Sequence, residues 1–295
     1  MEMKEILSKI RNYEIRIRKA VNAQMRGSFD SVFKGSGLEF DDVRAYQYGD
    51  DVRRIDWNVS AKGEETYIKV FREEKEQTIY FLLDVSDSQN IGSQKRTKLE
   101  VGKEICSVLA LSAVKESSQV GLICFSDQKE KYIKPDKGMK KGYEIVLNLF
   151  KLEPQSSQTD LTKFIHYALN LMKRRSIVIL VSDFIDDKNY LHSLKAMSRK
   201  HDLIVIHLVD EKERNMPKLG ILPLIDKETQ KIVWVNTSSR SFRKDLIDRY
   251  RENRQNLEST CRKYHANYLN VQTNEDIVPK LIKLFKVRNK KTANR

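Results

Sequence analysis

Asp84, Ser86 and Ser88 are spaced two residues apart at the end of an apolar run, in the order Asp-x-Ser-x-Ser. In an extended or gently turning segment, residues two apart project to the same side of the chain. The spacing therefore predicts that one carboxylate and two hydroxyl groups face a common point. The alternative is structural, because Asp and Ser residues after a strand commonly cap helices or form turns.

Two further oxygen donors follow later in the chain. Thr159 lies in a polar loop that leads into an expected helix, and Asp183 ends another apolar run. Hydroxyl and carboxylate oxygens without His or Cys favour Mg²⁺, with Mn²⁺ or Ca²⁺ as alternatives, over zinc. Mg²⁺ prefers an octahedron of oxygens, so two carboxylates and three hydroxyls leave at least one position for water or an incoming carboxylate.

The elements that must position these side chains are short buried strands. Nearly continuous apolar runs, each ending in Asp, occupy residues 78–84, 120–127, 176–183 and 203–210. Runs without alternation indicate burial on both faces, and the helix-like segments between them predict an α/β fold with a doubly wound, mostly parallel sheet flanked by helices. Ligands of such sheets bind beyond the carboxyl ends of the strands, which is where the candidate side chains fall.

Further elements flank this alternation. An apolar stripe from Ile6 to Val21 predicts an N-terminal helix that packs on the rest of the protein, with a partner or membrane-surface helix as the alternative. Residues 27–63 lack clean periodicity and contain several glycines, which indicates an irregular segment. Residues 66–72 predict an edge strand, residues 221–235 a hairpin, and residues 239–264 a long helix with a basic, solvated face.

The composition restricts the class of protein. The chain has 295 residues, of which 40% are hydrophobic, so a sizeable core is available. No apolar stretch reaches the roughly 18 residues that span a bilayer, and the N-terminus has no apolar signal core. Three cysteines lie far apart, which argues against a disulfide framework or a zinc site. We therefore expect a cytoplasmic protein, with peripheral attachment at the inner membrane as an alternative.

The positive charge is concentrated near the C-terminus. The net charge is +14, and residues 240–295 hold 15 basic and 6 acidic side chains. Such a region can bind phosphates through counterion release. No helix-turn-helix, zinc-finger or RNA-binding aromatic pattern accompanies it, so nucleic acid is not an expected partner and an anionic surface stays an alternative.

The oxygen donors resemble a known metal site. Asp84-x-Ser86-x-Ser88, then Thr159, then Asp183 match the metal-ion-dependent adhesion site of von Willebrand factor A (vWA) domains, and the resemblance covers roughly residues 76–273. The resemblance implies a vWA-like fold and a bound Mg²⁺ that is contacted by the hydroxyls. It also implies that the aspartates act directly or through water and that a partner's acidic side chain fills the open position.

A longer resemblance covers most of the chain. Residues 35–57, GSGLEFDDVRAYQYGDDVRRIDW, are similar to the signature of the bacterial DUF58 family. Many members of that family resemble proteins encoded beside MoxR-type AAA+ ATPases. The resemblance therefore implies an adaptor or chaperone partner of such an ATPase, acting on an unknown client protein.

The signature segment alternates acidic and basic residues. The favoured interpretation is a self-satisfied network of ion pairs and hydrogen bonds that holds an irregular loop in place, and a docking surface for the ATPase or its client is the alternative. Trp57 is expected to anchor in an apolar pocket. The residues considered for docking are Glu39, Arg44, Asp50, Asp51, Arg53, Asp56 and Trp57.

The expected organisation has three parts. Residues 1–75 hold the N-terminal helix and the signature segment, and residues 76–287 form the vWA-like domain with its hairpin insertion and a final helix near 277–285. Residues 288–295 form a basic, solvated tail.

The favoured function is a non-enzymatic, metal-dependent protein-binding module. The alternatives are a Mg²⁺-dependent phosphoryl-transfer or hydrolase enzyme and a binder of anionic surfaces or nucleic acid. The enzyme is disfavoured because aspartyl-phosphate enzymes typically carry Asp-x-Asp, where this chain has Ser86 two residues after Asp84.

Overall fold

The computed structural model describes Ser8, Arg11 and residues 39–61, 65–72, 77–93, 96–186, 188–214, 217–225 and 232–293. The chain divides into two compact units, Phe33–Gln77 and a larger unit that includes Thr78–Arg295. The expected N-terminal helix with its apolar stripe from Ile6 to Val21 lies outside the described residues.

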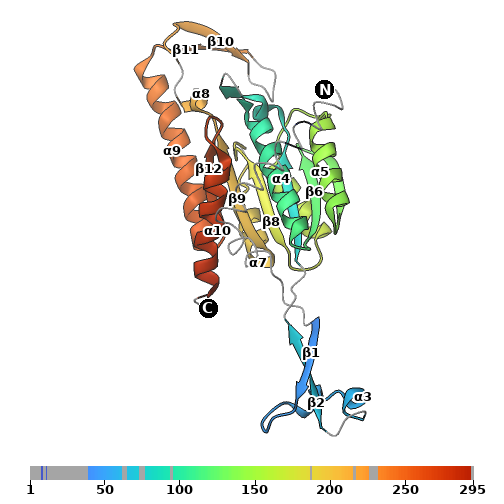
Figure 1. The fold of residues 1–295 in the computed structure, drawn as a ribbon. Coiled ribbons are helices and arrows are strands. Elements are labelled where there is room, and N and C mark those ends of the chain that lie inside the picture. Colours follow the sequence, from blue (N-terminus) through green and yellow to red (C-terminus); the bar gives the residue numbers. More distant parts are fainter. Residues whose placement is uncertain are drawn as a thin grey trace. The chain divides into compact units, whose positions relative to one another are not determined.

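A six-stranded sheet forms the centre of the larger unit (Figure 1). In chain order its strands are β3 (Thr78–Asp84), β6 (Gln119–Phe125), β7 (Lys129–Asp136), β8 (Ile177–Ser182), β9 (Asp202–Val209) and β12 (Asn267–Gln272). Their spatial order is β12-β9-β8-β3-β6-β7, and all neighbours are parallel except β6 and β7. The predicted doubly wound, mostly parallel sheet is confirmed, and its strand order reverses between β3 and β8.

Helices cover both faces of this sheet, as its continuous apolar strands require. One face packs against α6 (Leu161–Leu171), α7 (Leu191–Lys200) and α9 (Arg240–Lys263), whose buried residues join those of the strands in one cluster. The other face carries α4 (Lys98–Lys115), against which α5 (Met139–Lys151) packs. The apolar core therefore lies on both sides of the strands that lead to the candidate site.

The start of α4 is fixed by a cap and by a close approach to the sheet. Thr97 and Glu100 form a capping box, each side chain accepting a hydrogen bond from the other's backbone N–H. At Gly102, an added Cβ would lie 2.7 Å from Leu83 Cδ1 and 3.3 Å from Leu208 Cδ1. Only glycine lets the helix approach this closely, so the first turn of α4 is held near the strand ends.

The remaining elements of the larger unit are mostly short. They are η3 (Asp87–Asn90), β4 (Gly92–Ser93), β5 (Arg96–Thr97), α8 (Glu211–Arg214), β10 (Ile221–Ile225), β11 (Ile232–Asn236) and α10 (Ile277–Ala293). The predicted hairpin is present as antiparallel β10 and β11. The final helix is longer than expected: α10 continues to Ala293, because the Lys- and Arg-rich residues of the expected tail contain no Gly or Pro that would end a helix.

The smaller unit is built on two antiparallel strands. β1 (Glu39–Ala45) pairs with β2 (Tyr67–Arg72), and between them lie η2 (Val52–Arg54) and α3 (Trp57–Ser60). β2 is the expected edge strand. β1 falls in the segment expected to be irregular, since its sequence EFDDVRA does not alternate cleanly and its pairing contains a bulge.

Candidate functional site

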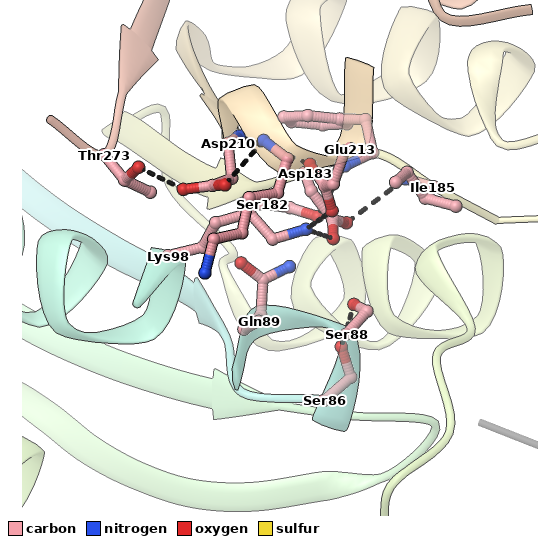
Figure 2. A network of polar contacts seen from close by, with 12 residues as sticks. Ser86, Ser88, Gln89, Lys98, Ser182, Asp183, Ile185, Asp210, Glu213 and Thr273 are labelled. Carbon is pink, nitrogen blue, oxygen red and sulfur yellow. Dashed lines mark hydrogen bonds and ion pairs between the residues drawn. The ribbon is translucent and has the colours of Figure 1, made fainter. Parts of the chain in front are cut away.

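Polar side chains gather beyond the carboxyl ends of β3 and β8, where the strand order of the sheet reverses. Asp84 is the last residue of β3, and Asp183 directly follows β8. Both side chains are buried. Figure 2 shows the surrounding network, which also includes Lys98 from the start of α4 and Glu213 from α8. The topology thus brings together residues that are about a hundred positions apart, at the place where sheets of this kind bind ligands.

The Asp84 carboxylate organises the Asp-x-Ser-x-Ser turn. Its Oδ1 accepts hydrogen bonds from the Ser86 backbone N–H at 3.0 Å and from the Ser86 hydroxyl at 2.7 Å. Its Oδ2 accepts from the Ser182 hydroxyl at 2.6 Å and from Gln89 Nε2 at 3.2 Å. The Ser86 and Ser88 hydroxyl oxygens lie 3.1 Å apart. These contacts fix the positions of both serine oxygens within a buried turn.

Asp183 joins this turn to the opposite strand of the switch point. Its Oδ1 accepts the backbone N–H of Ile185 at 3.2 Å, and the nearby Ser88 side chain helps to lower the pKa of Asp183. Asp84, Ser86 and Ser88 are thus linked through their side chains, and Asp183 lies beside Ser88.

Thr159 lies on the loop that precedes α6. The backbone N–H of Asp87 donates to the carbonyl oxygen of Ser157 at 3.0 Å, which ties this loop to the Asp-x-Ser-x-Ser turn. Thr159 is buried, and the next residue, Asp160, caps α6 by accepting from the Lys163 N–H at 2.8 Å. The loop that carries Thr159 thus borders the cluster.

Lys98 is the cation of the cluster. Its side chain is fully buried, and its Nζ donates to Asp183 Oδ2 at 2.6 Å and also to Glu213. Glu213 in turn accepts the backbone N–H of Asp210, and Asp210 accepts the hydroxyl of Thr273 (Figure 2). The network therefore extends from β3 and β8 across the ends of β9 and β12.

The two aspartates differ in their electrostatic surroundings. Burial, together with the charge of Asp183, raises the pKa of Asp84 to about 7. Burial acts to raise the pKa of Asp183 as well, but the charge and hydrogen bond of Lys98 outweigh it and hold that pKa below its ordinary value. One firmly ionised carboxylate thus lies beside one that is readily protonated, and a cation next to Asp84 would favour its ionised form.

Lys98 and Glu213 were not among the site residues predicted from the sequence. Lys98 is the first residue of α4, where a positive charge opposes the partial positive charge of the helix N-terminus. A lysine directly after the capping residue was the signal available, because an unfavourable placement suggests a compensating anion. Glu213 gave no comparable signal, since it lies in a four-residue helix among other charged residues.

In the smaller unit, several signature residues hold one another. Arg44 binds Asp50 through two hydrogen bonds of 2.8 and 2.7 Å, which lowers the pKa of Asp50. Asp51 caps η2 by accepting the Arg53 N–H at 3.0 Å. Asp56 caps α3 by accepting two backbone N–H groups at 3.0 and 3.3 Å. These contacts match the network interpretation of the segment.

Trp57 and Glu39 are the other two signature residues considered for docking. Trp57 is 70% exposed, so the expectation of an anchor in an apolar pocket is wrong. The physical reason is that α3 is a single turn without a buried residue. Glu39 begins β1, opposite Arg72 of β2.

Two properties of the described part of the chain bear on the expected class of site. No helix there is long and apolar enough to cross a bilayer. No group of three or more His, Cys, Asp or Glu side chains there is arranged to hold a metal ion. A cation at the switch point would therefore depend on hydroxyl oxygens as well as on the two carboxylates.

Several known proteins are similar to this chain. The uncharacterized protein Rv1480 of Mycobacterium tuberculosis is 20% identical over 288 residues, which cover 97% of this chain and 90% of that protein. The vWA domain of SpRpn10 is 11% identical, with a TM-score of 0.39, over 70% of this chain and 94% of that structure. An aerotolerance-related membrane protein from Bacteroides fragilis is 15% identical, with a TM-score of 0.46, over 73% of this chain and 99% of that structure.

The expected cytoplasmic location is corrected by these comparisons. The Bacteroides fragilis structure is described as that of a membrane protein. This description contradicts the cytoplasmic expectation, which rested on the absence of an apolar segment in the sequence, and we withdraw it.

A match to a protein-family model identifies the family of this chain. The model for the protein of unknown function DUF58 matches residues 42–256, from the signature segment through the sheet and into α9. Because this match covers more than half of the chain, the chain belongs to the DUF58 family.

Proposed function

We propose that this protein is a non-enzymatic, metal-dependent protein-binding module. Asp84, Ser86 and Ser88, with Thr159 and Asp183, would hold a divalent cation, Mg²⁺ first and Mn²⁺ or Ca²⁺ as alternatives. A carboxylate of a partner protein would complete the coordination.

The observation that carries the proposal is the arrangement of the serine hydroxyls. Ser86 donates its hydroxyl hydrogen to Asp84, so the lone pairs of its oxygen could coordinate a cation. The Ser86 and Ser88 oxygens are 3.1 Å apart. Adjacent ligands of an octahedral Mg²⁺ with bonds of 2.0–2.1 Å lie about 3 Å apart. The turn therefore presents two hard oxygens at a separation that suits Mg²⁺.

Asp84 is the carboxylate of the cluster that a divalent cation would stabilise. The buried Asp183 carboxylate needs a positive charge nearby, and the Lys98 ammonium supplies it. Asp84 has no cationic partner among its described contacts, and burial raises its pKa. A divalent cation between the two would lower the free energy of the Asp84 carboxylate, while Lys98 continues to neutralise Glu213.

The arrangement favours binding over phosphoryl transfer. Ser86 occupies the place where a second carboxylate would serve an aspartyl-phosphate enzyme. The next acidic residue, Asp87, accepts a hydrogen bond from Asn90 Nδ2 at 2.7 Å within η3. Its carboxylate thus takes part in the η3 turn.

We assign the partner by family resemblance to a MoxR-type AAA+ ATPase, with an unknown client. The smaller unit offers a surface suited to docking. Tyr48, Val52 and Trp57 are all exposed there, beside the polar signature residues. Exposed aromatic side chains next to charged ones are typical of protein interfaces.

Calorimetric titration of MgCl₂ into the full chain tests the metal site. We expect saturable binding that Ser88→Ala weakens strongly. Ser112→Ala is a matched control, because Ser112 is a buried serine of α4 that bonds only the carbonyl of its own helix at 2.8 Å in the described contacts. Equal Mg²⁺ binding by wild type and Ser88→Ala would refute the proposed site.

A pull-down of the MoxR-type ATPase tests the partner. We expect capture in Mg²⁺ that excess EDTA abolishes. Capture that persists unchanged in EDTA would show that the interaction does not use the cation.

A further inference from the structure

The hairpin of β10 and β11 carries large apolar side chains that the described part of the structure leaves uncovered. Ile221 is 66% exposed, Ile232 61% and Trp234 68%. Single exposed apolar residues are ordinary at a protein surface, but a contiguous group marks an interaction site.

The strand register places these side chains on one face. Pro223 pairs with Trp234, and cross-strand partners lie on the same side of a sheet. Ile221 and Ile232 are each two residues from one of this pair, so they share that side. We call Ile221, Pro223, Ile232 and Trp234 the apolar face of the hairpin. Val233, 53% exposed, points to the opposite side.

The hairpin leads directly into α9, as Figure 1 shows, and its base is closed by hydrogen bonds. The buried Thr237 donates both its N–H and its hydroxyl to the Gly220 carbonyl at 2.8 Å, and its hydroxyl accepts the Leu219 N–H at 2.9 Å. Gly220 has a φ of 81°, which favours glycine. These bonds hold the two strands together at the base of the hairpin, three residues before α9 begins.

The start of α9 is strongly basic. Arg240, Arg243 and Lys244 lie there, and the first turn contains no acidic residue. Cations at this end oppose the helix dipole, so an anion nearby would stabilise the arrangement. Residues 217–244 carry six basic and two acidic side chains in the sequence. The surroundings of the apolar face thus suit an anionic partner.

We propose that the apolar face of the hairpin docks on the surface of an anionic lipid bilayer. Trp234 enters the interfacial layer with the neighbouring isoleucines, and the basic start of α9 contacts headgroup phosphates. Tryptophan is suited to this layer because its ring is apolar and its N–H is polar. Apolar side chains combined with adjacent Lys and Arg are the usual elements of binding to a membrane surface.

The same residues disfavour nucleic acid as the occupant. Bases stack on aromatic rings, whereas most of this face is aliphatic. The proposal does not depend on the cation site, since none of its residues belongs to the cluster at the switch point.

Vesicle sedimentation with the full chain tests the proposal. The vesicles are equal parts phosphatidylcholine and phosphatidylglycerol, or phosphatidylcholine alone. We expect binding to the anionic vesicles, weakened about tenfold or more by Trp234→Ser. Val233→Ser is the matched control on the opposite side of the hairpin and should bind as wild type. Equal unfolding midpoints of both variants show that the fold is intact.

Fluorescence supplies a second measurement. The chain has two tryptophans, so in a Trp57→Phe background all tryptophan emission comes from Trp234. Anionic vesicles should shift that emission to the blue. The proposal is overturned by an absence of binding, by equal binding to both vesicle types, or by equal effects of Trp234→Ser and Val233→Ser. Self-association that Trp234→Ser removes, without vesicle binding, would assign the face to a second copy of the chain and overturn it too.

Discussion

The Nζ of Lys98 lies 2.6 Å from Oδ2 of Asp183, and neither side chain is exposed to solvent. The two residues come from the start of α4 and the end of β8, on either side of the candidate site. A buried ion pair of this kind stabilises little by itself, but the loss of one partner leaves an uncompensated charge. The pair therefore makes the stability of the fold depend on the positive charge available at the switch point.

Replacement of Lys98 by Met should make stability depend on the divalent cation. In EDTA we expect Lys98→Met to lose about 3–5 kcal/mol of unfolding free energy, because Asp183 and Glu213 remain without their cation. Mg²⁺ should restore more stability to this variant than to wild type. Urea denaturation in EDTA and in MgCl₂ measures both quantities.

The control for this experiment is Arg262→Gln, which removes a surface pair with Glu258. Exposed pairs contribute about 0–1 kcal/mol, so this variant should resemble wild type in both conditions. If Mg²⁺ stabilises Lys98→Met no more than it stabilises wild type, Mg²⁺ does not replace the Lys98 ammonium as the positive charge beside Asp183.

The raised pKa of Asp84 predicts that the stability of the protein depends on pH in the absence of metal. The pKa of Asp84 is about 7 in the folded protein, above the value of about 3.9 for an unfolded chain. The folded state therefore holds a proton that the unfolded state releases, and this contribution is lost as pH rises through 7. In EDTA, wild type should lose stability relative to Asp84→Asn between pH 5.5 and pH 8.

The comparison with Asp84→Asn is needed because two histidines act in the opposite direction. Burial lowers the pKa of His201 and His207 to about 4, so their contribution grows as pH rises through the ordinary value near 6.5. Both histidines are present in wild type and in Asp84→Asn, so their contributions cancel in the difference between the two unfolding free energies. Urea denaturation at pH 5.5 and pH 8 measures this difference. A difference that is flat with pH would mean that the folded Asp84 is ionised throughout this range.

Gly102→Ala tests the close approach that positions Lys98. The added methyl would lie 2.7 Å from Leu83 Cδ1, in a fully buried region, so α4 or the sheet must shift. We expect a loss of about 1–3 kcal/mol in urea denaturation and weaker Mg²⁺ binding. Gly138→Ala is an unsuitable control because its φ is positive. Ala110→Gly serves instead, because it destabilises the same buried helix by freeing the backbone and removing a buried methyl group, without crowding Leu83. Unaltered Mg²⁺ affinity in Gly102→Ala would show that cation binding does not depend on the position of α4.

The sequence predicted the sheet and the Asp-x-Ser-x-Ser turn for a physical reason. Strands buried on both faces must be apolar throughout, so they are visible as runs, and parallel strands bring their carboxyl ends to one edge. The convergence of Asp84 and Asp183 follows from that topology. Each feature depends on local pattern plus one general rule of α/β sheets.

Other features depend on tertiary packing and could not be predicted in the same way. The Lys98–Asp183 pair joins residues 85 positions apart, and no local spacing encodes it. The exposure of Trp57 was missed because aromatic residues are usually buried, whereas α3 offers only one turn and no groove. Helix α5 was also missed, since the apolar positions of its sequence lie among lysines and a glycine.

Trp57 gives the last prediction, for docking of the ATPase on the smaller unit. Because the side chain is 70% exposed, Trp57→Ala should change the unfolding free energy by no more than about 0.5 kcal/mol. If the signature segment is the docking surface, loss of this aromatic side chain should weaken binding of a MoxR-type ATPase by about 2 kcal/mol, or roughly thirtyfold. Biolayer interferometry with the purified ATPase measures the affinity. Trp234→Ala, which removes an equally exposed tryptophan from the larger unit, is the matched control and should bind as wild type. Equal affinity of Trp57→Ala and wild type would leave the signature residues with the structural role that the Arg44–Asp50 pair and the Asp51 and Asp56 caps already show.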